Sequence, residues 1–304
     1  EWRNVTEAKP LFKGHQQPNL PRDLGFYDLR LSETRSEQAN LAKEYGISGF
    51  CYWHYWFSGK RILEQPFQEV LKLKSPNFPF CLGWANHSWT GIWQNEPGKC
   101  LIKQTYSGIK DDINHFNFLK KAFKDKRYIK INGKPLFIIF KPNDIPNLKK
   151  KLDFWRELSF KNDLKGLYVL GINMNDINSG KELGLDGLIF STLGVVTSNN
   201  KYRENFSKFF WRFRRRFKLG GPRVINYKDI IDYLIPNLDS QDVEGFPCIF
   251  PNWDNTPRLG RRGLVLHNSK PEYFEILLKK AIKEVLKKRK QHQLIFIKSW
   301  NEWA

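Results

Sequence analysis

Amide and indole side chains, together with one glutamate, follow the last apolar run of the sequence. Residues 294–297 read Leu-Ile-Phe-Ile, and Asn301, Glu302 and Trp303 come a few positions later. Asparagine amides exchange hydrogen bonds with hydroxyl groups in both directions, and indole rings stack on the apolar faces of sugar rings. Glycosyl chemistry needs a carboxylate beside the anomeric carbon. Glu302 is therefore the candidate catalytic residue; its alternative role is a structural bond to a neighbouring loop.

Similar side chains follow several other apolar runs, and as a set they suit hydroxyl groups and sugar rings. The candidate substrate-binding residues are Tyr52, His54, Tyr55, Trp84, Asn86, His87, Trp89, Asn252, Trp253, Asp254, Asn301 and Trp303, and Asn173 follows a further run. Asp254 could bind hydroxyls, but Asp and Asn before Thr-Pro are also common turn formers. His87 could act as an acid or base, or only donate a hydrogen bond. Both alternatives stay open.

No recognised motif for a metal or a cofactor is present. No histidine pair lies at metal-ligand spacing, and neither His54 nor His87 has a carboxylate neighbour in sequence. The glycine-rich turn of dinucleotide-binding proteins and the P-loop are both absent from the sequence. We therefore expect no metal and no cofactor.

The chain is strongly basic, with 51 Lys and Arg against 31 Asp and Glu, a net charge of +20 and a pI near 9.7. The electrostatic field of a protein with this positive charge attracts nucleic acids, anionic lipids or phosphorylated substrates. The charge is spread along the chain and no nucleic-acid module is recognisable, so we expect no nucleic-acid partner. Residues 207–218, inside an insertion at 195–225, interleave aromatic and basic side chains. They could rest on an anionic membrane, or pack their aromatics inward and solvate their arginines.

Cysteine usage points to a reducing compartment. The four cysteines show no CxxC spacing, and Cys51 and Cys81 lie in apolar runs, where reduced buried thiols are expected. No apolar run approaches the roughly 18 residues of a membrane span. We therefore expect a cytoplasmic protein, peripheral to the inner membrane if residues 207–218 contact lipid.

Apolar runs alternate with helical patterns along the whole chain. Strands are predicted at 47–53, 78–84, 135–140, 166–171, 185–190, 246–250 and 294–297, and helices at 32–45, 61–73, 111–125, 147–161, 176–183, 226–238 and from Pro271 onward. Ser32 and Ser269 are the expected N-caps, and Gly46 should end the first helix. This alternation predicts an α/β fold with a parallel sheet wrapped by helices. Eight units would close a (β/α)8 TIM-like barrel; a doubly wound open sheet is the alternative.

Several segments resemble the WbsX-type glycosyltransferases of polysaccharide and O-antigen gene clusters, which have a glycoside hydrolase family 99-like domain. The matching segments are Glu1-Trp-Arg-Asn-Val, 24–30, 49–57, Trp84-Ala-Asn, 133–137, 253–258 and Asn301-Glu-Trp. The resemblance covers residues 1–304 as one domain and implies a (β/α) barrel. It also implies that the first strand lies upstream of Glu1 and that the last unit ends beyond Ala304.

The resemblance carries residue roles as well. In the related endo-α-mannosidases, Asn-Glu-Trp is followed one residue later by Glu-Gly, and both glutamates act in a retaining mechanism assisted by the substrate's 2-hydroxyl. Glu302 matches the first glutamate, and the second would fall just past Ala304. The family usually has Glu where this chain has His87, and Arg where it has Gly91. These departures put the specificity of this chain in doubt.

The resemblance implies a glycosyltransferase of surface polysaccharide biosynthesis. Its expected partners are a carbohydrate substrate, a sugar-nucleotide donor and a lipid-linked acceptor. One alternative is a retaining endo-acting hydrolase of α-linked, mannose-type glycans. A second alternative is a barrel that binds glycans without catalysis.

Overall fold

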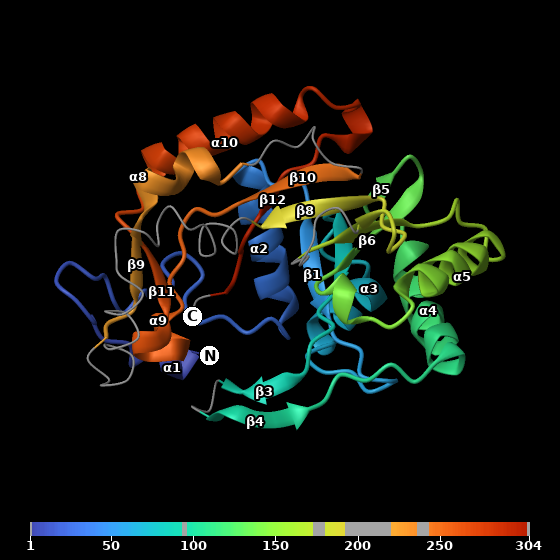
Figure 1. Cartoon of the computed structure of the whole chain (residues 1–304), viewed down its shortest axis with the longest axis horizontal. Helices are drawn as coiled ribbons and strands as arrows, with labels where there is room; N and C mark the ends of the chain where they lie inside the picture. The colour runs from blue at the N-terminus through green and yellow to red at the C-terminus, as the bar shows by residue number, and fades with distance from the viewer. Residues whose placement is uncertain (1, 93–95, 173–179, 192–219, 236–242, 303–304) are drawn as a thin grey trace.

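A curled parallel sheet forms the centre of the protein. The computed structural model describes residues 2–92, 96–172, 180–191, 220–235 and 243–302 (Figure 1). Its main sheet has the strand order β1 (Phe50–His54), β2 (Phe80–Trp84), β6 (Lys134–Ile139), β7 (Tyr168–Gly171), β8 (Gly187–Ser191), β10 (Glu244–Ile249) and β12 (Phe296–Ile297). All neighbours on this path are parallel. All seven predicted strands are confirmed, as is the TIM-like α/β class. Within the described residues no ladder joins β12 to β1, so the barrel is incomplete.

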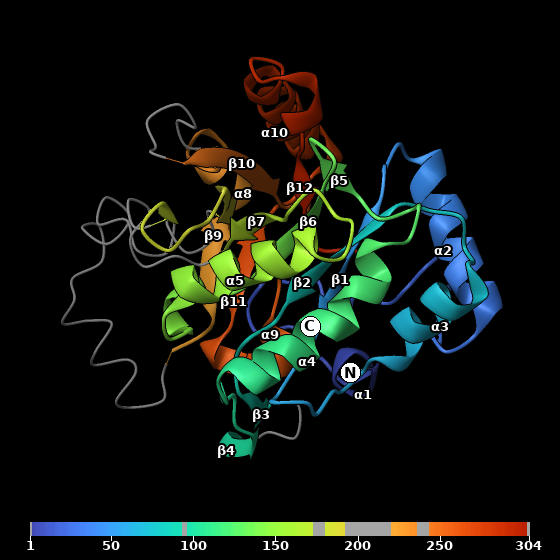
Figure 2. The same cartoon turned by 90° about the vertical axis from the view of Figure 1, so that its right-hand side faces the viewer.

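Helices cover the outer face of this sheet, as Figures 1 and 2 show. They are α2 (Ser32–Glu44), α3 (Gln65–Leu73), α4 (Ile109–Phe123), α5 (Leu148–Phe160) and α10 (Pro271–Val285). Phe116, Leu119 and Phe123 of α4 are completely buried against the sheet, and full burial of such a side chain contributes about 1.5–3 kcal/mol. None of the helices in the described part of the chain is long and apolar enough to cross a membrane.

Several predicted helix boundaries are wrong. Ser32 and Ser269 are not N-caps: the caps are Leu31 and Lys270, and Ser269 Oγ instead lies 2.9 Å from Asn252 Oδ1. Gly46 lies just after α2 and has a φ of +76°, so it ends this helix as predicted. The helix predicted at 226–238 is reduced to α8 (Tyr227–Ile230) and η5 (Ile231–Tyr233) in the described residues. Asn173, half of the helix predicted at 176–183 and the segment 207–218 lie outside the described residues.

Short elements between the main units escaped the sequence analysis. They are α1 (Trp2–Thr6), the hairpin of β3 (Trp89–Gly91) and β4 (Glu96–Ile102), β5 (Lys130–Ile131), α9 (Thr256–Leu259), η6 (Gly260–Arg262), and the parallel pair β9 (Arg223–Asn226) and β11 (Leu264–His267). Each is too short to show a clear period in sequence. The β9–β11 pair borders the loop after β10, because Asp254 forms a bridge with Val265.

Strand β1 shows which of its residues face the helices. Phe50 packs against Phe78 and Tyr52 against Phe67 of α3, whereas Trp53 packs against Phe140 inside the curl of the sheet. Side chains alternate along a strand, so Cys51 shares the inner face with Trp53. Cys51 is exposed, contrary to expectation.

Cys81, on the neighbouring strand, is buried as expected, and the described cysteines are free thiols.

The outer face also holds three residues that were predicted to bind substrate. Tyr52 packs on α3, and His54 and Trp84 are buried under α4 and α5. His54 Nε2 lies 2.8 Å from Nε2 of His115, which stacks on Trp56 at 4.5 Å.

One ring of this pair must donate a proton and the other must accept it. Burial lowers the pKa of His54 to about 3 and lowers that of His115 well below its usual value of 6.5.

These two histidines should make the protein acid-sensitive. The unfolded chain binds their protons below about pH 6.5, but the folded protein does not until near pH 3 for His54. The free energy of unfolding should therefore fall as the pH drops through this window. The double variant His54→Phe/His115→Phe should flatten this dependence, since it replaces both partners by apolar rings.

Urea unfolding at pH 7, 5.5 and 4.5 measures the effect. The single variant His54→Phe is the control, because it leaves His115 Nε2 buried without its partner and should cost about 1–3 kcal/mol at pH 7. An equally steep pH dependence in the double variant would contradict this account.

Candidate functional site

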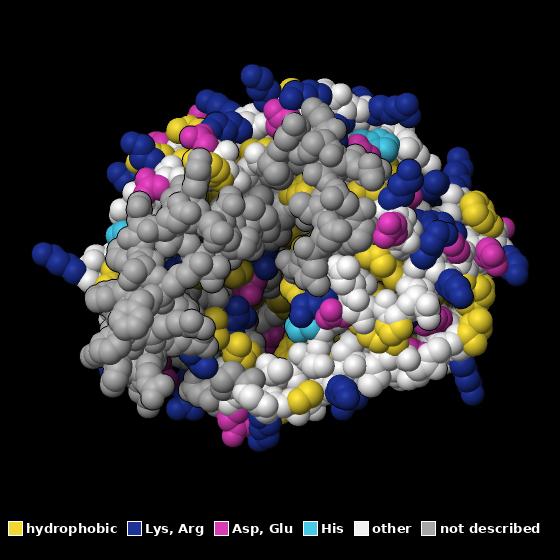
Figure 3. Space-filling model, in the orientation of Figure 1, with side chains coloured by type: hydrophobic (Ala, Val, Ile, Leu, Met, Phe, Trp, Pro, Cys, Tyr) yellow, Lys and Arg dark blue, Asp and Glu magenta, His cyan; other side chains and the backbone are white. Residues whose placement is uncertain are grey.

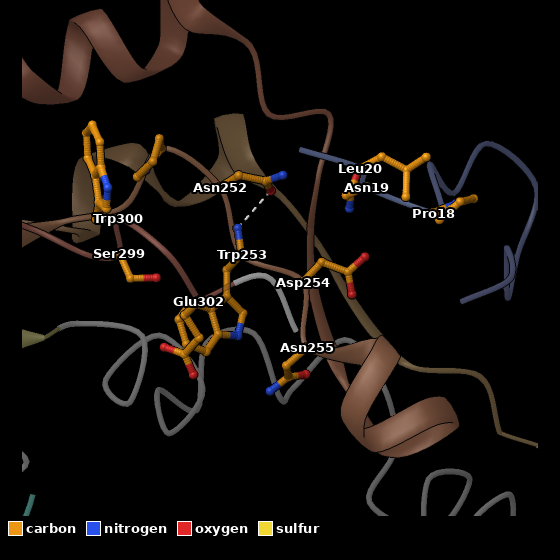
Figure 4. A pocket seen from close by; sticks show the side chains of 11 residues that line it. Pro18, Asn19, Leu20, Asn252, Trp253, Asp254, Asn255, Ser299, Trp300 and Glu302 are labelled. Carbon is orange, nitrogen blue, oxygen red and sulfur yellow. Dashed lines mark hydrogen bonds between the residues drawn. The ribbon is translucent and has the colours of Figure 1, made fainter. Parts of the chain in front are cut away.

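A cavity of about 400 Å³ lies at the carboxyl ends of β10 and β12 (Figure 4). Its walls come from three segments of the chain, at residues 18–20, 251–255 and 299–302. The lining residues are Pro18, Asn19, Leu20, Pro251, Asn252, Trp253, Asp254, Asn255, Ser299, Trp300 and Glu302. Figure 3 shows that the same face of the molecule is hollowed at its centre. The carboxyl ends of parallel strands are where barrel enzymes place their active sites.

Glu302 and Trp253 both lie close to the ammonium group of Lys298 at this cavity. Lys298 Nζ lies 4.8 Å from the centre of the Trp253 ring and 3.8 Å from Glu302 Oε2. On the other oxygen, Arg258 Nη1 donates to Glu302 Oε1 at 3.3 Å. The Glu302 side chain is 29% exposed, so its carboxylate still faces open space. Two cations thus orient a carboxylate beside an indole.

Asp254, the second carboxylate of the cavity, is fully engaged by the protein. Its Oδ2 accepts hydrogen bonds from His15 Nε2 at 2.8 Å and Gln17 Nε2 at 2.6 Å. Its Oδ1 accepts from the Thr256 N–H at 2.9 Å and the Thr256 hydroxyl at 2.6 Å. Because Leu11 N–H donates to His15 Nδ1, the proton of this ring sits on Nε2. The geometry favours the turn-forming, structural role of Asp254 over a role in binding hydroxyls.

The remaining predicted residues of this segment are accessible. Asn252 accepts from the Trp253 N–H at 2.7 Å through Oδ1 and is exposed. Asn301 is exposed beside Glu302. Trp303 lies outside the described residues. These amides stay candidates for hydrogen bonds to substrate.

Other predicted residues lie at the ends of β1 and β2. Asn86 is 1% exposed and clamps β2 to β6: its Oδ1 accepts from Lys141 N–H and its Nδ2 donates to Lys141 O, both at 2.8 Å. Asn86 is not among the residues that line the cavity. Tyr55 packs edge-on against Trp89 at 5.2 Å, away from the residues that line the cavity.

His87 lies on the inner face of the sheet beside Phe140. Its ring is 5.3 Å from that of Phe140, which packs against Trp53 at the same distance. Burial, and then the charge of Lys141, lower the pKa of His87. Its Nδ1 has no hydrogen-bond partner among the described residues. A neutral imidazole in this place can exchange a hydrogen bond with a ligand hydroxyl.

The sequence analysis missed several residues of this region, above all Trp53 and Trp300. Gly83 leaves room for Trp53, since a Cβ at Gly83 would lie 2.9 Å from the indole. Trp300 lines the cavity, and its Nε1 donates to Gln38 Oε1 of α2 at 3.1 Å. The two-residue period of β1 was the available signal: once His54 faces the helices, Trp53 must face the other side.

Within the described residues, no group of three or more His, Cys, Asp or Glu side chains is arranged to hold a metal ion. The described residues of the site offer one oriented carboxylate, two cations, exposed amides and partly exposed indole rings.

Known proteins share this architecture. Uncharacterized protein WxcX of Xanthomonas campestris pv. campestris (strain B100) is 32% identical over 313 residues, which cover 100% of this chain and 42% of that protein. The chain thus spans less than half the length of this curated relative. A glycoside hydrolase-like protein of solved structure has a TM-score of 0.58 at 12% identity, over 98% of this chain and 88% of that one. The GH99 endo-alpha-mannosidase from Bacteroides thetaiotaomicron has a TM-score of 0.54 at 14% identity, over 94% and 71%.

These structural similarities establish the TIM-like fold. The sequence shows the family as well. Residues 1–304, the whole chain, match the family described as Glycosyltransferase WbsX. The chain therefore belongs to the WbsX glycosyltransferase family.

Proposed function

We propose that the cavity at β10 and β12 is the active site of a glycosyltransferase in surface polysaccharide biosynthesis. The observation that carries this proposal is the placement of Glu302 at the cavity, held by Arg258 and Lys298 beside Trp253. Trp253 offers a flat apolar surface to a sugar ring, and the carboxylate faces the same space.

Glu302 acts at the anomeric carbon in this proposal. Asp254 cannot share that work, because both of its oxygens already accept two hydrogen bonds. A two-carboxylate retaining mechanism would therefore draw its second group from outside the cavity residues described above.

We also propose a donor and an acceptor for this reaction. A sugar nucleotide would supply the glycosyl unit, and a lipid-linked glycan would receive it at the cytoplasmic face of the inner membrane. The net charge of +20 supports this assignment, since both molecules are anionic. The family resemblance implies Glu and Arg where this chain has His87 and Gly91. If those family residues contact substrate, this chain has a different specificity.

Two other functions use the same geometry. A retaining endo-hydrolase would let water take the glycosyl unit and would release oligosaccharide without any donor. A binding barrel would hold glycan through Trp253 and the free amides, and would not depend on the Glu302 carboxylate. Measuring transfer and release in the Glu302→Gln variant separates the hydrolase and the binding barrel from the transferase.

Replacing Glu302 by Gln should lower turnover by orders of magnitude and preserve the fold. The amide keeps the shape of the side chain but cannot act as nucleophile or base, so the rate should fall by about 10²–10⁴-fold. The intact protein would be incubated with a panel of radiolabelled sugar nucleotides and a bacterial lipid extract. Transfer to lipid and release of free oligosaccharide would both be measured.

Glu275→Gln is the matched control, because this glutamate of α10 is 61% exposed and distant from the cavity residues. It should leave the rate unchanged. Wild-type turnover in the Glu302→Gln variant would remove this residue from the mechanism. Release of oligosaccharide without donor would replace the transferase by the hydrolase.

Replacing Trp253 by Ala should weaken glycan binding with a smaller effect on the chemical step. Loss of the stacking face should raise the Kd for the bound glycan about tenfold, corresponding to about 1.4 kcal/mol. Trp253→Phe should retain part of the affinity. Calorimetric titration with the transfer product measures the change, and Tyr45→Ala, a 73% exposed aromatic of the α2 terminus, is the control. Equal affinities in Trp253→Ala and Tyr45→Ala would place the sugar elsewhere.

A further inference from the structure

Helix α10 lies at the edge of the molecule, with one side packed on the sheet and the other facing solvent. Leu277 and Ala281 are completely buried in a cluster that includes Ile249 of β10. Figures 1 and 2 both show the helix on the outside of the sheet, with no labelled element beyond it. Among the described residues that line the Glu302 cavity, none belongs to α10. The outward side of this helix is therefore a surface separate from that site.

Three large apolar side chains lie on the outward side of α10. Ile276 is 45% exposed, Ile282 is 40% exposed and Leu286 is 63% exposed. In an α-helix these positions fall within about 120° of the circumference and cover about 15 Å of the length. Scattered exposed apolar residues are normal on a protein surface. Three along one side of one helix instead form a continuous apolar row.

The same stretch of chain is strongly basic. Residues 276–290 contain seven Lys or Arg and one acidic residue, Glu284. Lys279 pairs with Glu275 at 2.6 Å, and the lysine side chain is 72% exposed. An ion pair this exposed is weak in water. Lys279 can therefore exchange this partner for another anion.

Further cations extend the charge to the end of the helix. Lys283, Arg289 and Lys290 are exposed, and none of them forms an ion pair within the described residues. Lys280 and Lys288 instead pair with Asp232 and Glu244. Figure 3 shows Lys and Arg side chains along the edge of the molecule where α10 lies. The exposed cations thus lie beside the apolar row.

We propose that the outer face of α10, formed by Ile276, Lys279, Ile282, Lys283 and Leu286, binds the surface of an anionic phospholipid bilayer. Lysine ammonium groups reach lipid phosphates at the end of long apolar stems, while the apolar side chains between them enter the boundary of the acyl chains. Anionic lipids attract such cations. A nucleic acid would also attract them, but it would leave the three apolar side chains in water. The combination of charge and apolar surface therefore favours a bilayer.

Sedimentation with large vesicles tests the inference on the intact protein. Vesicles of phosphatidylcholine with about 30% phosphatidylglycerol should bind the protein, and pure phosphatidylcholine should bind it about tenfold more weakly, because it lacks the anionic charge. Salt should weaken the binding, since the Debye length falls from about 10 Å at 0.1 M to about 3 Å at 1 M. Absence of binding to the anionic vesicles would overturn the inference.

Two variants separate the contribution of charge from that of apolar contact. Lys279→Gln/Lys283→Gln/Lys290→Gln should lower the partition coefficient about tenfold or more, because three cations are lost. Ile276→Gln/Leu286→Gln keeps every charge and should also lower it about tenfold, because these side chains no longer enter the lipid. Thermal unfolding of each variant confirms that the fold is intact.

Matched controls come from α4 and α5. Lys149→Gln/Lys150→Gln/Lys161→Gln removes the same charge from exposed positions of α5 and its C-cap. Ile109→Gln/Phe160→Gln removes two apolar side chains that are 65% and 64% exposed. Both controls should change the partition coefficient by less than about twofold, because they leave the outer face of α10 intact.

Equal losses in the α10 variants and the controls would overturn the inference, because they would show attraction to the overall charge or hydrophobicity of the protein. Wild-type partitioning in both α10 variants would place the lipid contact elsewhere and overturn it as well. Stronger binding to an oligonucleotide than to vesicles, lost in the lysine variant, would assign this face to nucleic acid instead. Glu302→Gln should bind vesicles as the wild type does, so this test is independent of the proposed catalytic role.

Discussion

The parallel ladder between β10 and β12 is the constraint on which the site depends. Cys248 pairs with Phe296 and Ile249 with Ile297, and the Lys298 N–H continues the ladder to Ile249 O at 2.9 Å. This register fixes where both strands end. The residues that follow each strand must therefore emerge at one edge, which brings Trp253 next to Lys298 and Glu302. A shift of one residue would turn the side chains of β12 to the opposite face.

A second constraint fixes the cavity wall formed by residues 18–20. His15 and Gln17 lie more than 230 positions before Asp254 in sequence, yet both donate to its Oδ2. The carboxylate is almost completely enclosed, and burial of a charge is tolerated only when hydrogen bonds satisfy it. Asp254 therefore holds the N-terminal segment against the loop after β10. The wall formed by residues 18–20 depends on that bond network and not on any strand.

The sequence analysis predicted the sheet well because each strand is a short apolar run between helical patterns. It placed residues at strand ends but not on faces: Trp84 is the last residue of one such run and Trp253 follows another, and only Trp253 lines the cavity. The face of the sheet on which a side chain lies depends on tertiary packing. The two-residue alternation of a strand shows which side chains share a face, but not which face packs against the helices. The His15–Asp254 bond and the β9–β11 pair were out of reach, because both arise from contacts between distant segments.

The same reasoning applies to the 11 tryptophans of the chain. Trp56, Trp84 and Trp155 are buried in the outer layer, where they surround His115. Their rings contribute core packing and enclose polar groups that would otherwise be costly to bury. Trp53, Trp253 and Trp300 instead keep part of their surface accessible on the inner face or at the cavity. Aromatic abundance alone therefore does not indicate a sugar site; a sugar site requires indoles that stay exposed on the side of the sheet where the carboxylate lies.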